Sequence, residues 1–481
     1  MHPPPPPSPK PKHAWITLDR VDPPKRSPAD RLADFRQTQL PYDEATAMEQ
    51  ASRCIQCPQP VCVAACPLHA PLDELLRLTA NGQFREAAEL LIASHSIPEL
   101  AAHTCVGGRR CERSCLLAGK SEAVPIRAVT RFLLDYGWKH GLAEPPTESR
   151  KGQSVAVLGS GLGGLVAADL LSRRGYAVTV YDSRRNPGGR MMNGLPGFRM
   201  DRELVERRLT LLRQRGVVFR MGVAFGQDVR LSDLRREFDA VFLGFGRALG
   251  VPLEVPGADL RGVHQALPFI CQNTRECGGA VDEDLAAQPR IEVRGRRVVV
   301  LGGGDTAMDV LRMAIRCGAT DALCIYRRDE ASLPADVEEY ENAREEGARF
   351  LFLAQPLAVH GNAAGQVTQV RCIRMQTDQP DADGRTTVCP VAGSEFDVPA
   401  DVVFVAYGFV PPRLPPTDDF AQLVVDAKGD VQVDAQRMTN LPGVFAGGSI
   451  VHHTAPLSEV VRDAREASAA MDRYLTARRI A

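Results

Sequence analysis

The stretch Val155-Ala156-Val157-Leu158-Gly159-Ser160-Gly161-Leu162-Gly163-Gly164 decides the fold of this chain. A short strand rich in β-branched residues runs into a glycine turn, and the apolar spacing beyond it predicts a helix that ends near Gly175. Gly159 permits the tight turn, Gly161 lets a pyrophosphate approach the backbone, and Gly164 lets the helix pack against the strand. The phosphates of a bound dinucleotide would then lie at the helix N-terminus.

A second predicted strand strengthens this interpretation. It covers Ala177–Tyr181 and ends at Asp182, which is placed to accept a hydrogen bond from a ribose 2′-hydroxyl. A glycine motif alone is weak evidence, because a turn can be followed by an acid by coincidence. Strand, turn, helix and terminal acid together predict a dinucleotide-binding domain.

The same pattern begins again at Arg297. Val298–Leu301 form the predicted strand, and the glycine turn reads Gly302-Gly303-Gly304-Asp305-Thr306-Ala307. The next strand, Ala322–Tyr326, ends in Arg327-Arg328 instead of an acid. A guanidinium pairs with a 2′-phosphate, whereas an acid would repel it, so this second unit is expected to bind NADPH. Two solvated arginines after a strand are the alternative. The candidate NADPH-binding residues are Gly302, Gly304, Asp305, Thr306, Arg327 and Arg328.

Seven of the 13 cysteines lie close together in the N-terminal part of the chain. They are arranged as Cys54-x2-Cys57-x4-Cys62-x3-Cys66-Pro67 and Cys105-x5-Cys111-x3-Cys115. Such clustering indicates metal ligation, and thiolates suit iron–sulfur clusters or zinc. Two 4Fe–4S clusters need eight ligands, which the seven cysteines and one other residue would supply. Zinc would leave one site a ligand short or one thiol spare, and purely structural thiols are a third possibility.

Helical periodicity surrounds these cysteines. Residues 13 to about 140 carry apolar residues at three- and four-residue spacing, for example in Leu72–Leu78 and Phe84–Ile92. A polar, proline-bearing stretch from His140 to Gly152 then predicts a linker. We therefore expect an α/β chain in which an all-α iron–sulfur domain precedes two Rossmann-like dinucleotide-binding domains.

Composition excludes several classes of function. The formal net charge is -1 and aromatic residues make up 6% of the chain, so neither nucleic acid nor a membrane surface is an expected partner. Met1–Lys12 is a proline run without an apolar core, which argues against a secretory signal and for the cytoplasm. Disulfides are unexpected in that compartment.

Residues around the cysteines resemble a known domain. Arg53-Cys54-Ile55-Gln56-Cys57, Ala65-Cys66-Pro67-Leu68 and Cys111-Glu112-Arg113-Ser114-Cys115 are similar to the N-terminal domain shared by glutamate synthase small subunits and dihydropyrimidine dehydrogenase. The resemblance extends over residues 30 to 475. It implies one cluster on the cysteines Cys54, Cys57, Cys62 and Cys115.

The resemblance also implies a second cluster on Cys66, Cys105 and Cys111 with a glutamine or glutamate as the eighth ligand. Thr130 occupies that position here. A neutral hydroxyl is a poor iron ligand, so we expect this cluster to be the weaker one, with water or a neighbour such as Glu122 completing it.

The first dinucleotide-binding unit resembles the FAD-binding half of the same family. Pro187-Gly188-Gly189-Arg190 and Gly194-Leu195-Pro196-Gly197-Phe198-Arg199 match its continuation, and Gly443–Ser449 matches its closing motif. That motif normally ends in an aspartate, and Ser449 in its place should weaken FAD binding by roughly 1–2 kcal/mol. The candidate FAD-binding residues are Gly159, Gly161, Gly164, Asp182, Gly189, Arg190 and Ser449.

A redox dithiol of the Cys-x2-Cys kind is absent after Cys115. Reducing equivalents taken up by the flavin must therefore leave by another route, which the clusters provide. The chain resembles a glutamate synthase small subunit, which implies electron transfer from NADPH through FAD and two 4Fe–4S clusters to a large-subunit partner. The alternatives are the NADPH-oxidising subunit of a pyrimidine-reducing or other reductase, and a non-catalytic redox-sensing or assembly subunit.

These assignments predict a division of the chain. Residues 1–28 form a disordered proline-rich tail, and residues 29–145 form the helical domain. The FAD-binding domain comprises residues 146–288 and 400–481, and the NADPH-binding domain comprises residues 289–399.

Overall fold

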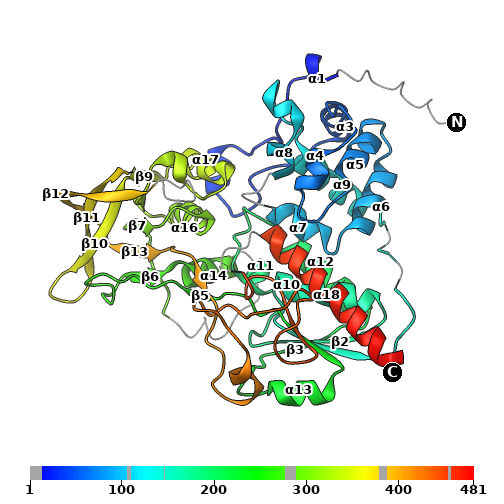
Figure 1. Cartoon of the computed structure of the whole chain (residues 1–481). Coiled ribbons are helices and arrows are strands. Elements are labelled where there is room, and N and C mark those ends of the chain that lie inside the picture. The colour runs from blue at the N-terminus through cyan, green and yellow to red at the C-terminus, as the bar shows by residue number, and fades with distance from the viewer. Residues whose placement is uncertain are drawn as a thin grey trace.

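The computed structural model describes residues 14–105, 110–142, 144–145, 147–276, 289–378, 387–452 and 457–480. A helical unit at the N-terminal end is followed by two parallel α/β sheets (Figure 1). The predicted fold class is therefore confirmed. None of the helices in these ranges is long and apolar enough to cross a membrane.

The helical unit forms because its apolar residues repeat at helical spacing. Leu72, Leu75 and Leu76, for example, are all buried in one core with Phe84 and Leu91. Its elements are α1 (Ala14–Thr17), α2 (Pro28–Leu32), α3 (Glu44–Ser52), α4 (Val61–Ala65), α5 (Leu72–Ala80), α6 (Phe84–Ser94), α7 (Pro98–Thr104), α8 (Arg110–Arg113), the 3-10 turn η1 (Leu116–Gly119) and α9 (Ile126–Lys139).

The first sheet has the strand order β15-β4-β1-β2-β3, and all of its strands are parallel. Its strands are β1 (Ser154–Leu158), β2 (Ala177–Asp182), β3 (Val218–Met221), β4 (Ala240–Leu243) and β15 (Val444–Ala446). Its helices are α10 (Leu162–Arg173), α11 (Gly189–Asn193), α12 (Arg202–Gln214), α13 (Leu231–Glu237), the 3-10 turn η3 (Asp418–Gln422) and α18 (Leu457–Ile480).

The second sheet repeats this design with the order β6-β13-β7-β8-β9, again parallel. Its strands are β6 (Val263–Gln265), β7 (Arg297–Leu301), β8 (Asp321–Tyr326), β9 (Arg349–Phe352) and β13 (Val402–Val405). Its helices are α14 (Ala266–Glu276), α16 (Asp305–Arg316), the 3-10 turn η2 (Glu330–Ser332) and α17 (Val337–Glu345).

Two smaller antiparallel sheets complete the fold. The strands β10 (Ala354–Gly361), β11 (Val367–Thr377) and β12 (Val388–Pro399) project from the second sheet at the left of Figure 1. The short strands β5 (Leu249–Gly250) and β14 (Phe409–Val410) pair with each other.

The expected domain division needs correction at two strands. Residues 263–265 and 402–405 were assigned to the FAD-binding domain, but β6 and β13 belong to the second sheet. The chain therefore enters the second sheet before residue 289 and leaves it after residue 399, the two boundaries expected from the sequence. Strand pairing over long sequence separations decides this, and it leaves no local signal.

The expected tail also needs correction. Residues 1–13 lie outside the described ranges, but residues 14–28 are an ordered arm on the helical unit. The backbone N–H of Val21 donates to the Gln50 side chain (3.1 Å), and Arg20 pairs with the buried Glu112 (3.0 Å). These partners are distant in sequence, so proline content alone could not indicate them.

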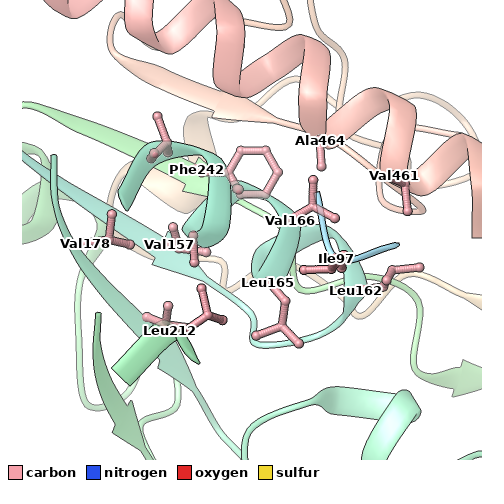
Figure 2. Close-up of a cluster of buried hydrophobic side chains, with 14 of the residues drawn as sticks. Ile97, Val157, Leu162, Leu165, Val166, Val178, Leu212, Phe242, Val461 and Ala464 are labelled. Carbon is pink, nitrogen blue, oxygen red and sulfur yellow. The ribbon is translucent and has the colours of Figure 1, made fainter. Parts of the chain in front are cut away.

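The helical unit is joined to the first sheet by an apolar contact. Ile97, just before α7, is fully buried and lies beside Leu162 and Val461 of the flanking helices (Figure 2). Its φ of +50° is strained for a β-branched residue, so the surrounding packing must hold it there.

A buried ionic cluster reinforces the same junction. Arg208 on α12 donates to Glu99 of α7 (2.7 Å), to Glu144 of the linker (2.9 Å) and to Asp169 of α10 (3.2 Å). The Arg208 side chain is 2% exposed, so loss of any carboxylate would leave charge uncompensated in the interior.

We predict that Ile97→Ala lowers the stability of this junction by about 2–5 kcal/mol, because a cavity replaces the buried side chain. The midpoint of thermal unfolding, followed by circular dichroism, should fall. Ile16→Ala is the matched control, since Ile16 is 64% exposed and its truncation should leave the midpoint nearly unchanged. Equal midpoints for Ile97→Ala and the wild type would contradict this role.

Candidate cofactor sites

A cavity of about 330 Å³ lies at the carboxyl edge of the first sheet, where ligands bind in open α/β folds. The fold brings six of the seven predicted FAD-binding residues to its walls: Gly159, Gly161, Asp182, Gly189, Arg190 and Ser449. They come from four separate stretches of the chain. Residues from all four stretches therefore line the same cavity.

Glycine geometry explains why the turn between β1 and α10 needs these residues. Gly159 has a φ of +102°, and a Cβ there would lie 2.5 Å from the backbone of Phe245. Gly164 does not line the cavity; a Cβ on it would lie 1.8 Å from the Gly159 carbonyl oxygen. Nothing lies within 4 Å of the position of a Gly161 Cβ. The backbone at Gly161 therefore faces open space at the start of α10, which fits a pyrophosphate.

Asp182 is the last residue of β2, and its side chain also accepts hydrogen bonds from the glycine turn. One of its carboxylate oxygens accepts from the backbone N–H (2.7 Å) and the hydroxyl (2.6 Å) of Ser160. The other accepts from the backbone N–H of Arg184 (2.9 Å). This carboxylate can orient the turn and still face a ribose from the cavity wall.

Other cavity residues carry no sequence motif and were missed. Phe245 and Arg247 follow β4 and line the cavity near Ser449, whose carbonyl accepts from Arg247 Nε (2.7 Å). Arg247 also forms a buried ion pair with Asp430. The predicted Arg190 is stacked over the ring of Phe409, with its guanidinium carbon 4.7 Å from the ring centre.

A second cavity of about 700 Å³ lies at the carboxyl edge of the second sheet. Five of the six predicted NADPH-binding residues line it: Gly302, Gly304, Thr306, Arg327 and Arg328. Gly302 has a φ of +125°, and no atom lies within 4 Å of a Gly304 Cβ position. The α16 N-terminus therefore also opens onto free space that fits a phosphate.

Asp305 departs from this expectation. It is not among the cavity-lining residues, and its carboxylate accepts from the backbone N–H of Asp336 (2.9 Å). Burial raises the pKa of Asp305, and the Arg199 guanidinium opposes that rise. The side chain therefore connects the start of α16 to the residue that precedes α17, and it does not line the cavity.

Arg327 and Arg328 are available to bind an anion. Neither makes an ion pair within the described ranges, although the chain forms many such pairs elsewhere. Arg328 Nε is buried without a hydrogen-bond partner there. Two uncompensated guanidinium groups beside a nucleotide cavity fit a 2′-phosphate.

The cysteines of the helical unit fall into two groups. In the first, burial contributes most to raising the pKa of Cys62 to about 11, and the nearby Cys54 and Cys115 contribute to the same rise. Burial likewise raises the pKa of Cys54 and of Cys57, with added repulsion from Cys115 in both cases. These thiols therefore lie near one another although Cys115 is distant in sequence.

The second group contains Cys66, Cys105 and Cys111. Burial raises the pKa of Cys105, and the thiolate of Cys66 raises it further. Burial raises the pKa of Cys111 well above its usual value, and Glu112, Cys105 and Cys66 add to that rise. These three thiols therefore lie close together in a buried place, where a bound cation would favour the thiolate form, and this fits iron–sulfur ligation.

Over the described part of the chain, no set of three or more His, Cys, Asp or Glu side chains is arranged to hold a single metal ion.

Thr130 lies on α9, and its hydroxyl donates to the Ile126 carbonyl of the preceding turn (2.8 Å). The suggested substitute Glu122 is exposed, and its carbonyl accepts from Arg53 in the first group's surroundings (2.8 Å). The carboxylate beside the second group is instead Glu112. Its two oxygens accept from the backbone N–H of Arg127 and from Arg20, each at 3.0 Å.

Two dinucleotide cavities beside a cysteine-rich helical unit define a flavin- and pyridine-nucleotide-dependent oxidoreductase with an iron–sulfur domain. Comparisons with known proteins agree. The family model of dihydropyrimidine dehydrogenase domain II with its 4Fe–4S cluster matches residues 31–142. The model of pyridine nucleotide-disulphide oxidoreductases matches residues 153–472.

The chain is also similar to complete proteins. It is 36% identical to the glutamate synthase [NADPH] small chain of Escherichia coli K12 over 461 residues, covering 95% of this chain and 97% of that protein. It is 38% identical to the same-named chain of Azospirillum brasilense, covering 95% of each. It is 37% identical to the putative oxidoreductase AegA of E. coli K12, covering 94% of this chain and 69% of that protein.

The chain therefore belongs to the glutamate synthase small-chain family. The predicted enzyme class, an NADPH-dependent flavin and iron–sulfur oxidoreductase of this type, is confirmed. The solved structure of Mycobacterium tuberculosis FprA in complex with NADPH covers 68% of this chain and 86% of its own, with a TM-score of 0.55 and 18% identity. That likeness shows the shared fold of the two sheets.

We predict that Arg327→Ala raises the Michaelis constant for NADPH about 10-fold or more and leaves that for NADH nearly unchanged, because a charged hydrogen bond contributes about 1.5–3 kcal/mol. Steady-state reduction of an artificial acceptor measures both constants. Arg349→Ala on the neighbouring strand is the control, since Arg349 pairs with Asp321 away from the cavity. Equal effects on both nucleotides would overturn the assignment of this cavity.

Proposed function

We propose that this chain is the electron-input subunit of a two-subunit enzyme of the glutamate synthase type. The bound groups would supply hydride uptake from NADPH by FAD and one-electron transfer by two 4Fe–4S clusters to a partner subunit. The observation that carries this proposal is the position of the second cysteine group, which lies where the helical unit meets the flavin-binding sheet.

Cys66 supports this position directly. It packs against both the core of the helical unit and the core of the first sheet. Leu68, two residues further on, is buried in the first sheet's core, and its carbonyl accepts from Arg465 of α18 (3.2 Å). The start of α18 in turn contributes Leu457 and Val460 to the flavin cavity. The second cysteine group is thus joined to the flavin site by one helix.

The first cysteine group lies further from the flavin-binding sheet. Cys54, Cys62 and Cys115 pack against the helical core and not against the core of the first sheet, and Gln56, Pro58 and Gln59 beside Cys57 are exposed. Electrons would reach this group last, at a surface that a partner subunit can contact. The proposed order is therefore flavin, second group, first group and partner.

No pair of cysteines beyond Cys115 has the Cys-x2-Cys spacing of a redox dithiol. Cys324 and Cys372 are buried, Cys389 is partly buried, and Cys277 lies outside the described ranges. Arg327 and Arg328, with no acid at the end of β8, favour NADPH as the electron donor. The large glutamate synthase chain as partner, the cluster count and a cytoplasmic location remain predictions.

Affinity purification under anaerobic conditions, followed by identification of the co-eluting chain, tests the proposed partner. We expect a large subunit with an amidotransferase domain, together with rapid reduction of a dye by NADPH. A co-eluting pyrimidine-binding barrel would replace this proposal with a pyrimidine reductase. A chain that binds neither FAD nor NADPH would be a non-catalytic subunit.

We predict that the cluster on Cys66, Cys105 and Cys111 is the less stable one, because Thr130 offers no charged ligand. On exposure to a chelator, Mössbauer spectra should show loss of about half of the cluster iron before the rest. Thr130→Glu should slow that loss, since a carboxylate can ligate iron.

Thr130→Val is the matched control, because it keeps the side-chain shape and removes only the hydroxyl. It should behave like the wild type. Two clusters of equal stability in the wild-type protein would show that the eighth position is filled by another group.

A further inference from the structure

The loop Gly194–Arg199 has a different role from the FAD contact that its motif suggested. It is not among the residues that line the flavin cavity. Arg199 lies instead between the two α/β units, where its guanidinium donates to Asp309 on α16 (3.0 Å) and lies 3.3 Å from Glu339 on α17. The loop belongs to the first unit and both carboxylates belong to the second.

All three side chains are nearly inaccessible to water. Arg199 is 7% exposed, Asp309 is 6% exposed and Glu339 is 13% exposed. Burial raises the pKa of Asp309, and the Arg199 guanidinium opposes that rise. Arg199 therefore favours the charged form of Asp309 at the contact between the two units.

The residue before Arg199 extends this contact. The ring of Phe198 is covered by the guanidinium groups of Arg312 (4.1 Å) and Arg316 (4.4 Å), both on α16. Arg312 is fully buried and pairs with Glu346 (2.9 Å). Phe198 and Arg199 together thus contact one face of α16.

Helix α16 connects this contact to the nucleotide cavity. Its first turn begins at Gly304 and Thr306, which line the cavity, and Asp309 lies one turn further along. The carbonyl of Gly303 accepts from the backbone N–H of Ala335 (3.2 Å), just before α17. A change in how Arg199 contacts α16 would therefore shift the cavity that holds the nucleotide.

We propose that Arg199 is a positioning residue for hydride transfer, because it fixes the nucleotide cavity relative to the flavin cavity. This inference rests on the proposed reduction of FAD by NADPH. Arg199 touches neither cavity, so it acts through α16 and α17. Binding of NADPH itself would depend on residues that Arg199 does not contact.

The second α/β unit has attachments that do not involve Arg199, so loss of Arg199 need not unfold it. The second unit is also attached to α9 through an ion pair of Arg127 with Glu338, and to α2 through Arg31 with Glu345 (2.6 Å). Without Arg199 the unit would stay folded and attached to the helical unit. It would lose the ion pairs of Arg199 with Asp309 and Glu339, which connect it to the first unit.

The test compares Arg199→Gln and Arg199→Lys with the wild-type holoenzyme in anaerobic stopped-flow mixing with NADPH. We expect Arg199→Gln to lower the limiting rate of flavin reduction by about 100-fold, because small misplacements of reacting groups have large effects. The NADPH dissociation constant from the same experiment should stay within about threefold. Arg199→Lys, which keeps the charge, should recover most of the rate.

The matched control is Arg207→Gln on α12, which removes an ion pair with Glu203 inside the first unit (2.7 Å) and should leave the rate unchanged. Hydrogen–deuterium exchange of peptides from α16 and α17 should increase in Arg199→Gln and return toward wild type in Arg199→Lys. Hydrogen–deuterium exchange can be measured without catalytic turnover by the enzyme.

A wild-type limiting rate in Arg199→Gln would overturn the proposal. So would a loss of rate that Arg199→Lys does not recover, or a loss matched by an equal loss of NADPH affinity. If NADPH fails to reduce the flavin of the wild-type protein, the proposed function fails, and hydrogen exchange still decides whether Arg199 holds the two units together. Should Arg199→Gln not fold, Asp309→Asn removes the other half of the ion pair and should give the same loss of rate within the same limit on NADPH affinity.

Discussion

The packing of the helical unit on the flavin-binding sheet is the contact on which the rest of the structure depends. Electrons pass between separate groups only when those groups are held at a fixed, short separation. Ile97 supplies the apolar part of this contact and Arg208 the ionic part. Together they fix the second cysteine group beside the helix that reaches the flavin cavity. A helical unit on a flexible tether could bind clusters, but it would not hold them at a fixed distance from the flavin for electron transfer.

Buried arginines recur at each junction of the three units. Arg208 joins the helical unit to the first sheet, Arg199 joins the two sheets, and Arg127 joins α9 to the second sheet. Buried ion pairs contribute little net stability, but removal of one partner is strongly destabilising. Such contacts therefore select one relative orientation of the units rather than strengthen any single unit. This is the property that a fixed electron path requires.

The sequence predicted the parts of this protein that depend on local patterns. Both glycine turns, the strands before them and Asp182 lie where the patterns indicated, and the cysteines separate into the two groups that the resemblance implied. Contacts between distant residues were not predictable. Asp305 faces a neighbouring loop, Arg199 contacts the other unit, and residues 14–28 are held by partners such as Gln50 and Glu112. The spacing of residues in the sequence does not indicate which arginine forms an ion pair with which distant carboxylate.

Electron exchange between the flavin and the clusters within one chain can be measured directly. The anaerobic holoprotein is reduced with dithionite, the excess reductant is removed and NADP⁺ is added, with low-temperature electron paramagnetic resonance as the readout. We expect NADP⁺ to abolish the signal of the reduced clusters, because their electrons return through FAD to the nucleotide. Persistence of the cluster signal after NADP⁺ has reoxidised the flavin would show that this exchange does not occur.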